Sequence, residues 1–295
     1  MILVKETKNN GKLVFKEIEY SIAKEMMLNN HYSKKWNTSF GKINIGVFKD
    51  DVLLGAAVFG NLMNPNSYKK VNNTFEKGEF IELNRMWIDD KLTKNAESCL
   101  ISSSMKLIKK LYPNIRAVQS FADGRLGCGT IYKATNFDYY GFTESLFFEN
   151  IKTGEVLHKV PLENTKRPIG FIGKNIPYLL GDLKTFKVKT YKYIFWLDKR
   201  AKKYSSVNSV PYPEYDKGTT DVTFKHPIGL LARLYLMIQK VDPNSVHLEN
   251  ISNRFTDDEF KSALNEQLKN KSLQWFFNEY ITTEKNLNTI KELIK

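Results

Sequence analysis

The stretch EFIELNRMWIDD, residues 79–90, decides the fold, because its apolar and aromatic side chains are typical of a β-strand. The polar loop KLTKNAES, residues 91–98, follows it. Cys99–Leu111 then carries apolar residues at helical spacing, and Pro113 ends this predicted helix. A second strand is predicted over Ile115–Ala122. The order strand, polar loop, helix, strand predicts an α/β domain in which the loop opens onto a helix N-terminus.

The neighbouring sequence extends this unit in both directions. Before it, we predict a hairpin, a helix and two strands, at Met1–Val4 with Leu13–Ile18, Tyr20–Asn29, Lys42–Lys49 and Val52–Phe59. After it come the glycine-rich loop Asp123–Gly129, a short helix from Thr130, and strands at Phe137–Phe142 and Phe186–Leu197. The sequence therefore predicts a central mixed sheet flanked by helices.

The character of the chain changes beyond Val222, where helical patterns replace strand patterns. They occur at Leu230–Ile238, Asp257–Leu268, Leu273–Ile281 and Thr289–Leu293, and Thr256 is a plausible cap for the second of them. We therefore predict two domains, an α/β domain at residues 1–217 and a small helical domain at residues 218–295.

Charge and composition limit the class of protein. The 295 residues carry a formal net charge of +13, which favours a polyanionic partner, with nucleic acid ahead of an anionic membrane surface. The two cysteines, Cys99 and Cys128, have no framework spacing, and no stretch has the length of a membrane span. Neither does the N-terminus have the apolar core of a signal peptide. These features predict a protein of the reducing cytoplasm.

The loop Lys94-Asn95-Ala96-Glu97-Ser98 is a candidate phosphate site, because the first amides of a helix are unpaired and lie at the positive end of its dipole. The alternative is structural. Asn95 or Ser98 would then be the N-cap of the helix, with Glu97 as a capping partner.

A second candidate site lies at the end of the strand Ile115–Ala122. Asp123 could act as a base toward an amine, or as a metal ligand, and Tyr132 on the following helix could donate a proton to a leaving thiolate. The structural alternatives are a turn aspartate that caps the helix at Thr130 and a buried core tyrosine.

Two further pairs of residues are candidates for binding. Glu82 and Arg85 lie at odd spacing on one strand, so they are expected on opposite faces, and an arginine in an apolar strand needs an anionic partner. His31 and Tyr32, where a helix gives way to a loop, could hold a flipped base or simply anchor the loop.

Basic and aromatic residues provide candidate contacts to DNA phosphates and bases. These candidates are Lys34, Lys35, Trp36, Lys187, Lys189, Lys199, Arg200, Lys202 and Lys203.

Several short motifs occur in the order in which they occur in the Mom family of phage DNA-modification proteins, which this sequence resembles. They are His31-Tyr32-Ser33, Gly55-Ala56-Ala57-Val58-Phe59-Gly60, Glu82-Leu83-Asn84-Arg85, Lys94–Ser98, Ser120–Asp123 and Gly129-Thr130-Ile131-Tyr132. The resemblance covers residues 29–141 well and residues 191–212 more loosely, and the C-terminal helices lie outside it.

The resemblance implies a GNAT-like acyltransferase fold and an enzyme that converts adenine N6 in double-stranded DNA to a carbamoylmethyl form, which protects DNA from restriction. Its cofactor would be acetyl-CoA or a related acyl-CoA, with a divalent metal such as iron as a tentative addition. Acetyl transfer alone does not form a carbamoylmethyl group, so a further step is required.

The resemblance also assigns roles to residues. It makes His31, Tyr32, Asp123 and Tyr132 catalytic, and it places Arg85 and the segment Lys94, Asn95, Ala96, Glu97 and Ser98 at the cofactor. His31 and Asp123 are the tentative metal ligands. Cys128 stands where the family has a histidine, so the role of that histidine would fall to Cys128.

Two other functions stay open at this point. One is an ordinary GNAT acetyltransferase that acts on a protein or a small-molecule amine. The other is a non-enzymatic DNA-binding or host-interaction protein on a decayed GNAT fold. A homodimer is compatible with each of them.

Overall fold

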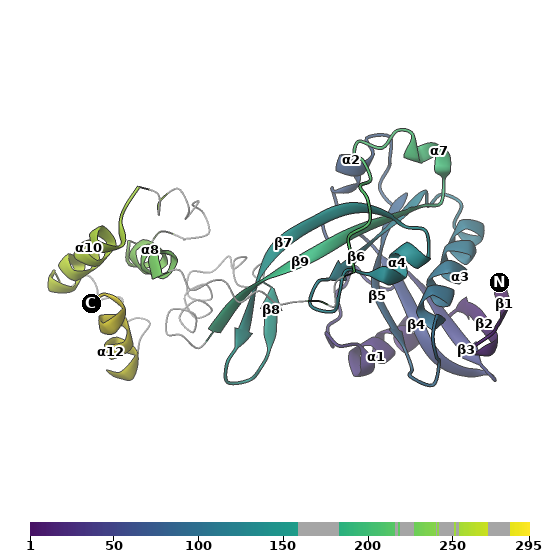
Figure 1. Cartoon of the computed structure of the whole chain (residues 1–295), viewed down its shortest axis with the longest axis horizontal. Coiled ribbons are helices and arrows are strands. Elements are labelled where there is room, and N and C mark those ends of the chain that lie inside the picture. The colour runs from purple at the N-terminus through teal and green to yellow at the C-terminus, as the bar shows by residue number, and fades with distance from the viewer. Residues whose placement is uncertain are drawn as a thin grey trace. The chain divides into compact units, whose positions relative to one another are not determined.

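The computed structural model describes residues 1–158, 183–215, 218, 227–239, 241, 251, 254–270 and 284–295. Within them, a nine-stranded sheet has the order β1-β2-β3-β4-β5-β6-β9-β7-β8 (Figure 1). Its strands are β1 (Ile2–Thr7), β2 (Gly11–Glu17), β3 (Ile43–Lys49), β4 (Val52–Gly60), β5 (Phe80–Ile88), β6 (Ala117–Asp123), β7 (Asp138–Asn150), β8 (Val156–His158) and β9 (Leu183–Trp196). The described helices are α1 (Tyr20–Asn30), α2 (Tyr68–Val71), α3 (Ala96–Leu111), α4 (Thr130–Ala134), α7 (Lys199–Lys202), α8 (Pro227–Ile238), α10 (Asp257–Lys269) and α12 (Glu284–Leu293). The predicted mixed sheet with flanking helices is confirmed.

The central strands β5 and β6 run parallel, but they pair along only part of their length. Their register joins Phe80–Leu83 to Ala117–Ser120, whereas β5 continues to Ile88 and β6 to Asp123. The two strands therefore share no ladder at their carboxyl ends, which is where ligands bind in open α/β sheets.

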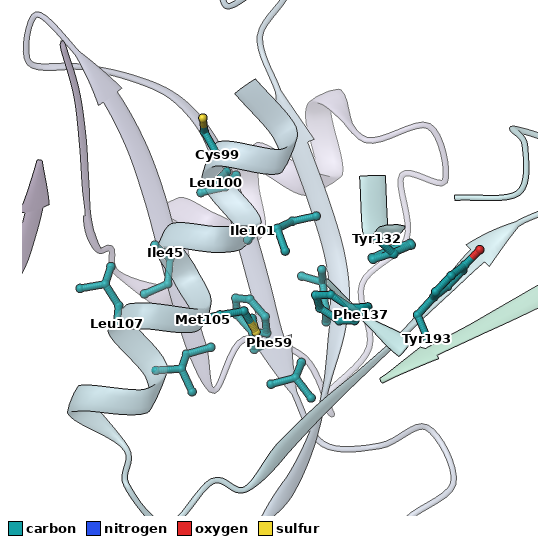
Figure 2. Close-up of a cluster of buried hydrophobic side chains, with 14 of the residues drawn as sticks. Ile45, Phe59, Cys99, Leu100, Ile101, Met105, Leu107, Tyr132, Phe137 and Tyr193 are labelled. Carbon is teal, nitrogen blue, oxygen red and sulfur yellow. The ribbon is translucent and has the colours of Figure 1, made fainter. Parts of the chain in front are cut away.

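Helix α3 covers one face of the sheet with an apolar side. Leu100, Ile101, Leu107 and Ile108 on this helix are fully buried, and Figure 2 shows the first three of them beside Ile45 and Phe59 of the sheet. The sequence predicts a start at Cys99, but the helix begins three residues earlier, at Ala96. Its first turn is therefore made of residues that the apolar pattern did not include.

A β-bulge in β5 decides which side chains share a face of the sheet. The register between β4 and β5 shifts at Val58 and Phe59, where Val58 pairs with Arg85 but Phe59 pairs with Leu83. Leu83 belongs to the core under α3, whereas the Arg85 guanidinium lies over the Phe40 ring in the cluster that packs against α1.

The same bulge corrects one prediction from the sequence. Ile81 and Leu83 face α3, so Glu82 between them faces away from it, as Arg85 does. The expectation that Glu82 and Arg85 lie on opposite faces is therefore wrong, because the extra residue in the bulge reverses the alternation after Leu83.

The chain divides into two compact units, one made of Met1–Thr143 with Lys189–Thr219 and the other of Glu144–Val188 with Thr220–Lys295. The division at residues 217 and 218 into two consecutive domains stays a prediction. In the second unit, the expected cap is present, because Thr256 and Glu259 form a capping box at the start of α10. The predicted helix Leu273–Ile281 lies outside the described residues.

Two predicted elements differ in extent. The strand expected at Phe137–Phe142 is β7, which continues to Asn150, and the strand expected at Phe186–Leu197 is β9, which begins at Leu183. Among the described helices, none combines the length and apolarity needed to cross a membrane.

Candidate active site

Asp123 ends β6 and is held in place by its own loop. The Arg125 guanidinium donates hydrogen bonds to both carboxylate oxygens of Asp123, and the Arg125 amide donates to Oδ1 at 3.0 Å. Gly124 lies between them because a Cβ there would come within 2.4 Å of the Lys189 carbonyl oxygen, to which the Gly124 amide donates. The loop thus fixes the orientation of the Asp123 carboxylate at the carboxyl end of β6.

Tyr32 brings α1 to this carboxylate. Its hydroxyl lies 3.5 Å from Asp123 Oδ2, although the two residues are 91 positions apart, and its side chain is 57% exposed. Burial of the hydroxyl and the charge of Asp123 raise the pKa of Tyr32, so this group stays protonated near neutral pH. The structure therefore joins two of the predicted catalytic residues in one exposed pair.

His31 lies beside Tyr32 as a neutral ring. The two ring centroids are 4.3 Å apart, and His31 Nδ1 accepts a hydrogen bond from the Ser33 amide at 3.1 Å. Because an amide can only donate, the hydrogen of the neutral ring is on Nε2. Burial, and then the charge of Arg85, lowers the pKa of His31 to about 4, so the ring presents a neutral N–H donor.

Arg85 completes this group with a cation that has no counter-ion among the residues that the structure describes. Its guanidinium carbon lies 4.6 Å from the Phe40 ring centroid, one Nη donates to the Asn84 carbonyl at 2.6 Å, and the buried Nε has no partner. Among the described residues no carboxylate lies within ion-pair distance of it. Burial lowers the pKa of Arg85, although a guanidinium remains charged. Arg85 can therefore bind an anionic group of a ligand.

A buried carboxyl group on the same face, that of Glu82, belongs to a hydrogen-bond network that the sequence did not predict. Glu82 accepts hydrogen bonds from Gln119 at 2.7 Å and from Asn84 at 3.1 Å, and all three side chains are buried. Burial raises the pKa of Glu82 and lowers that of Lys192 on β9, which is attracted to Glu82. Polar residues at alternate positions of apolar strands were the available signal for this network.

The start of α3 has no side-chain cap. Asn95 occupies the N-cap position with φ +71°, but its side chain makes no capping bond, and Ser98 donates to the Asn95 carbonyl at 3.0 Å. The capping role considered for Asn95 and Glu97 is therefore wrong for their side chains. The Ala96 amide donates to the Thr93 carbonyl at 3.2 Å, whereas the amides of Glu97 and Ser98 remain open to a phosphate group, which fits the pyrophosphate of a coenzyme A ester.

The loop that leads into α3 is held from the first hairpin. Asn10, which is buried, accepts hydrogen bonds through Oδ1 from the Thr93 amide at 2.7 Å and from the Thr93 hydroxyl at 3.2 Å. The Asn9 amide group reaches the Lys94 carbonyl. These contacts fix the start of α3 and leave the amides of Glu97 and Ser98 free.

Tyr132 lies in the core under α3, with its hydroxyl directed at Ser120. Ser120 Oγ donates to the Tyr132 hydroxyl at 2.8 Å, and the ring stacks on Tyr193 at 4.8 Å (Figure 2). Burial raises the pKa of Tyr132 to about 12, so the phenol is protonated at neutral pH. The description of Tyr132 as a buried core tyrosine is confirmed, and its role as a proton donor stays a prediction.

The structure gives no support to a metal centre. In the part of the chain that it describes, no three His, Cys, Asp or Glu side chains lie close enough together to hold an ion. His31 Nδ1 is engaged by Ser33, and both oxygens of Asp123 are engaged by Arg125. Cys128 is buried in the core under α3 and does not supply a third ligand.

The predicted DNA-contacting residues do not form one group. Lys34 and Lys35 are exposed next to Tyr32, whereas Trp36 packs edge-on against Tyr20 and Phe40. Further along the chain, Lys187 pairs with Glu144, Lys189 lies over Phe142, and Lys202 pairs with Asp138. Lys199, Arg200 and Lys203 are exposed on and just after α7.

Comparison with known proteins identifies the family. The family model of the Mom protein family matches residues 12–214, which include every candidate catalytic residue. The protein called methylcarbamoylase mom, from Escherichia phage Mu, is 36% identical over 201 residues, which cover 65% of this chain and 80% of that protein.

Solved structures that resemble this chain include two acetyltransferases. The N-acetyltransferase from Staphylococcus aureus Mu50 has a TM-score of 0.36 at 12% identity and covers 63% of this chain and 99% of its own. The ribosomal-protein-S5-alanine acetyltransferase from Vibrio fischeri has a TM-score of 0.38 at 10% identity and covers 67% and 98%. Both TM-scores are below 0.5, so the assignment rests on the sequence matches. On those matches, the chain belongs to the Mom protein family.

Proposed function

We propose that this protein is a transferase that modifies adenine N6 in double-stranded DNA to a carbamoylmethyl derivative, with an acyl-CoA as the carbon donor. The 36% identity to methylcarbamoylase mom supports the reaction class. The proposal rests mainly on one contact. The Tyr32 hydroxyl lies against the Asp123 carboxylate, beside the neutral ring of His31, at the carboxyl ends of β5 and β6, where these strands no longer pair.

The adenine would bind at the exposed side of this group. Tyr32 is exposed and His31 lies beneath it, so an extruded base can stack on the tyrosine ring, as bases do in enzymes that flip them. His31 Nε2–H is a donor, which suits a ring nitrogen of adenine. Arg85 would hold an anionic group of the bound nucleotide or of the donor.

Asp123 would act on the amine itself. Formation of a carbon–nitrogen bond at N6 removes one hydrogen from that nitrogen, and a carboxylate acceptor must be within hydrogen-bond reach of it. Arg125 binds both carboxylate oxygens of Asp123 and fixes them in place, so this carboxylate can orient the amine. Tyr32 would share this carboxylate and hold the base against it.

The residues at the start of α3 would hold the cofactor. The amides of Glu97 and Ser98 suit its pyrophosphate, and Lys94 adds a positive charge. An acyl-CoA supplies an activated two-carbon unit when it is bound. The carbamoylmethyl group also needs two co-substrates, an ammonia-level nitrogen donor that forms the amide and a two-electron oxidant that lets the methyl carbon bond to N6. Tyr132, protonated and directed at the end of the β5–β6 ladder through Ser120, would donate a proton to the leaving thiolate.

Nucleoside mass spectrometry of plasmid DNA from expressing cells tests this proposal. We expect a deoxyadenosine that is heavier by one carbamoylmethyl group with the native chain, and none with Asp123→Asn, because the amide cannot accept the proton. Asp198→Asn is the matched control, since Asp198 is also a strand-end aspartate paired with arginines, Arg116 and Arg200. Equal modification by the native chain and Asp123→Asn would remove Asp123 from the chemistry.

A further inference from the structure

Two short helices that are far apart in the sequence place their cations side by side. Helix α2 carries Lys69 and Lys70, and α7 with the residue after it carries Lys199, Arg200, Lys202 and Lys203. All six are exposed, and Figure 1 shows α2 and α7 as neighbours. We call these six residues the α2–α7 basic patch.

Buried hydrogen bonds hold the two helices together. Asn72, at the end of α2, is fully buried and donates to the Ala201 carbonyl of α7 at 2.9 Å. The Ser206 amide donates to the Val71 carbonyl at 2.8 Å. Beneath them, Val71 and Ala201 belong to one apolar cluster with Phe75 and Trp196. The patch is therefore a fixed surface, and only the ends of its side chains can move.

Most of its charge is not neutralised by the protein. Lys202 pairs with Asp138 at 2.7 Å, and Arg200 pairs with Asp198, which also binds Arg116. Within the described residues, Lys69, Lys70, Lys199 and Lys203 have no ion-pair partner. A surface with four uncompensated ammonium groups on a rigid base favours a polyanion.

The position of the patch relates it to the candidate active site. Helix α7 follows β9, whose Trp196 pairs with Ala117 at the start of β6, whereas Asp123 lies at the other end of β6. Six residues of strand separate these ends by about 20 Å, at roughly 3.3 Å per residue. That length corresponds to about six base-pair steps of duplex DNA.

We infer that the α2–α7 basic patch binds the phosphate backbone of the DNA duplex beside the base that is modified. The inference rests on the proposed function, and it adds Lys69 and Lys70 to the DNA-binding residues. The patch would position the duplex and would not read sequence, because lysines on phosphates carry no base information. Its contribution should be strongly salt-dependent.

The test compares two pairs of adjacent lysines that differ only in the helix on which they lie. Lys69→Gln/Lys70→Gln removes the pair in the last turn of α2, and Lys109→Gln/Lys110→Gln removes the pair in the last turn of α3. Both variants lose the same charge. Binding to a labelled DNA duplex is measured by fluorescence anisotropy over a series of salt concentrations, and thermal melts verify that each variant is folded.

We expect the α2 variant to lose about tenfold or more in affinity and to lower the slope of log K against log salt by about 1.8, from two phosphate contacts at roughly 0.9 each. The α3 variant should keep the native slope. An equal loss of DNA affinity in both variants, or a native salt slope in both, would contradict the proposed role of the α2–α7 basic patch. Binding of the native chain to anionic lipid vesicles in preference to duplex, lost with Lys69→Gln/Lys70→Gln, would also overturn it.

Failure of the patch and failure of the proposed function give different results. If the native chain binds duplex through Lys69 and Lys70 but never changes the mass of deoxyadenosine, the result supports DNA binding by the patch and contradicts the proposed reaction. If the α2 variant modifies adenine at the native rate with DNA below saturation, the result contradicts DNA binding by the patch and leaves the proposed reaction unaffected.

Discussion

Among single residues, His31 shows how burial sets the charge of this site. Its pKa is lowered to about 4, so the ring stays neutral in the folded protein while an unfolded histidine, with a pKa near 6.5, becomes protonated on acidification. The folded state therefore loses stability as the pH falls from about 6.5 to 4, and this loss is absent above pH 7.

This pH dependence can be measured against a variant without the ring. In His31→Asn, the side-chain oxygen can still accept from the Ser33 amide. Between pH 7 and pH 5, we expect the free energy of unfolding of the native chain to fall further than that of His31→Asn, by up to about 2 kcal/mol. Parallel curves from chemical denaturation at the two pH values would show that His31 is solvated and titrates normally.

Tyr132 and Tyr193 give a matched pair in which one hydroxyl is predicted to act in catalysis. The rings stack on each other, and each hydroxyl makes a hydrogen bond, Tyr132 with Ser120 and Tyr193 with the Cys128 carbonyl. Both changes to Phe should cost about 1 kcal/mol of stability.

Only Tyr132→Phe should slow the transfer, by roughly a hundredfold, because only it removes the proposed proton donor. Single-turnover rates at saturating cofactor separate this effect from binding. If Tyr193→Phe slows the reaction as much as Tyr132→Phe, the hydroxyl of Tyr132 has no special role and the effect is one of packing.

At the scale of elements, the N-terminus of α3 shows what a backbone conformation alone can reveal. Asn95 has φ +71°, a region that favours glycine, and its side chain makes no cap. Asn95→Gly should therefore keep or slightly raise the stability, whereas Asn95→Ala should lose about 1 kcal/mol. Thermal unfolding measures both. A loss of similar size in Asn95→Gly would mean that the Asn95 side chain does cap the helix.

The bulge in β5 marks the limit of what the sequence predicts about this element. Apolar residues at Ile81, Leu83, Met86 and Ile88 identify the strand correctly. Alternation alone, however, places Glu82 and Arg85 on opposite faces, because a bulge depends on the partner strand and has no local signal here. The grouping of Arg85 with His31 is consequently a result of tertiary structure.

For the whole molecule, the order of the elements was predictable, and their contacts were not. Hydrophobic periodicity predicted the hairpins, α1, α3 and the strands of the sheet, with ends that differ by a few residues. The pairing of Tyr32 with Asp123, the ladder that stops at Leu83, and the contact of α2 with α7 all join residues that are far apart in the sequence. Such contacts follow from packing and cannot be read from spacing.

The central claim is that the acyl carbons of the donor are transferred to adenine in DNA, and one measurement follows these carbons directly. The chain, in a lysate of the cells that express it, is incubated with duplex DNA and acetyl-CoA whose acyl group carries heavy carbon, because the lysate supplies the nitrogen donor and the oxidant. The DNA is then digested to nucleosides for mass spectrometry. We expect the heavy carbon in a modified deoxyadenosine, and its absence with Asp123→Asn. Heavy carbon found only on protein or small-molecule amines, with every nucleoside at its normal mass, would contradict adenine modification and favour an ordinary acetyltransferase.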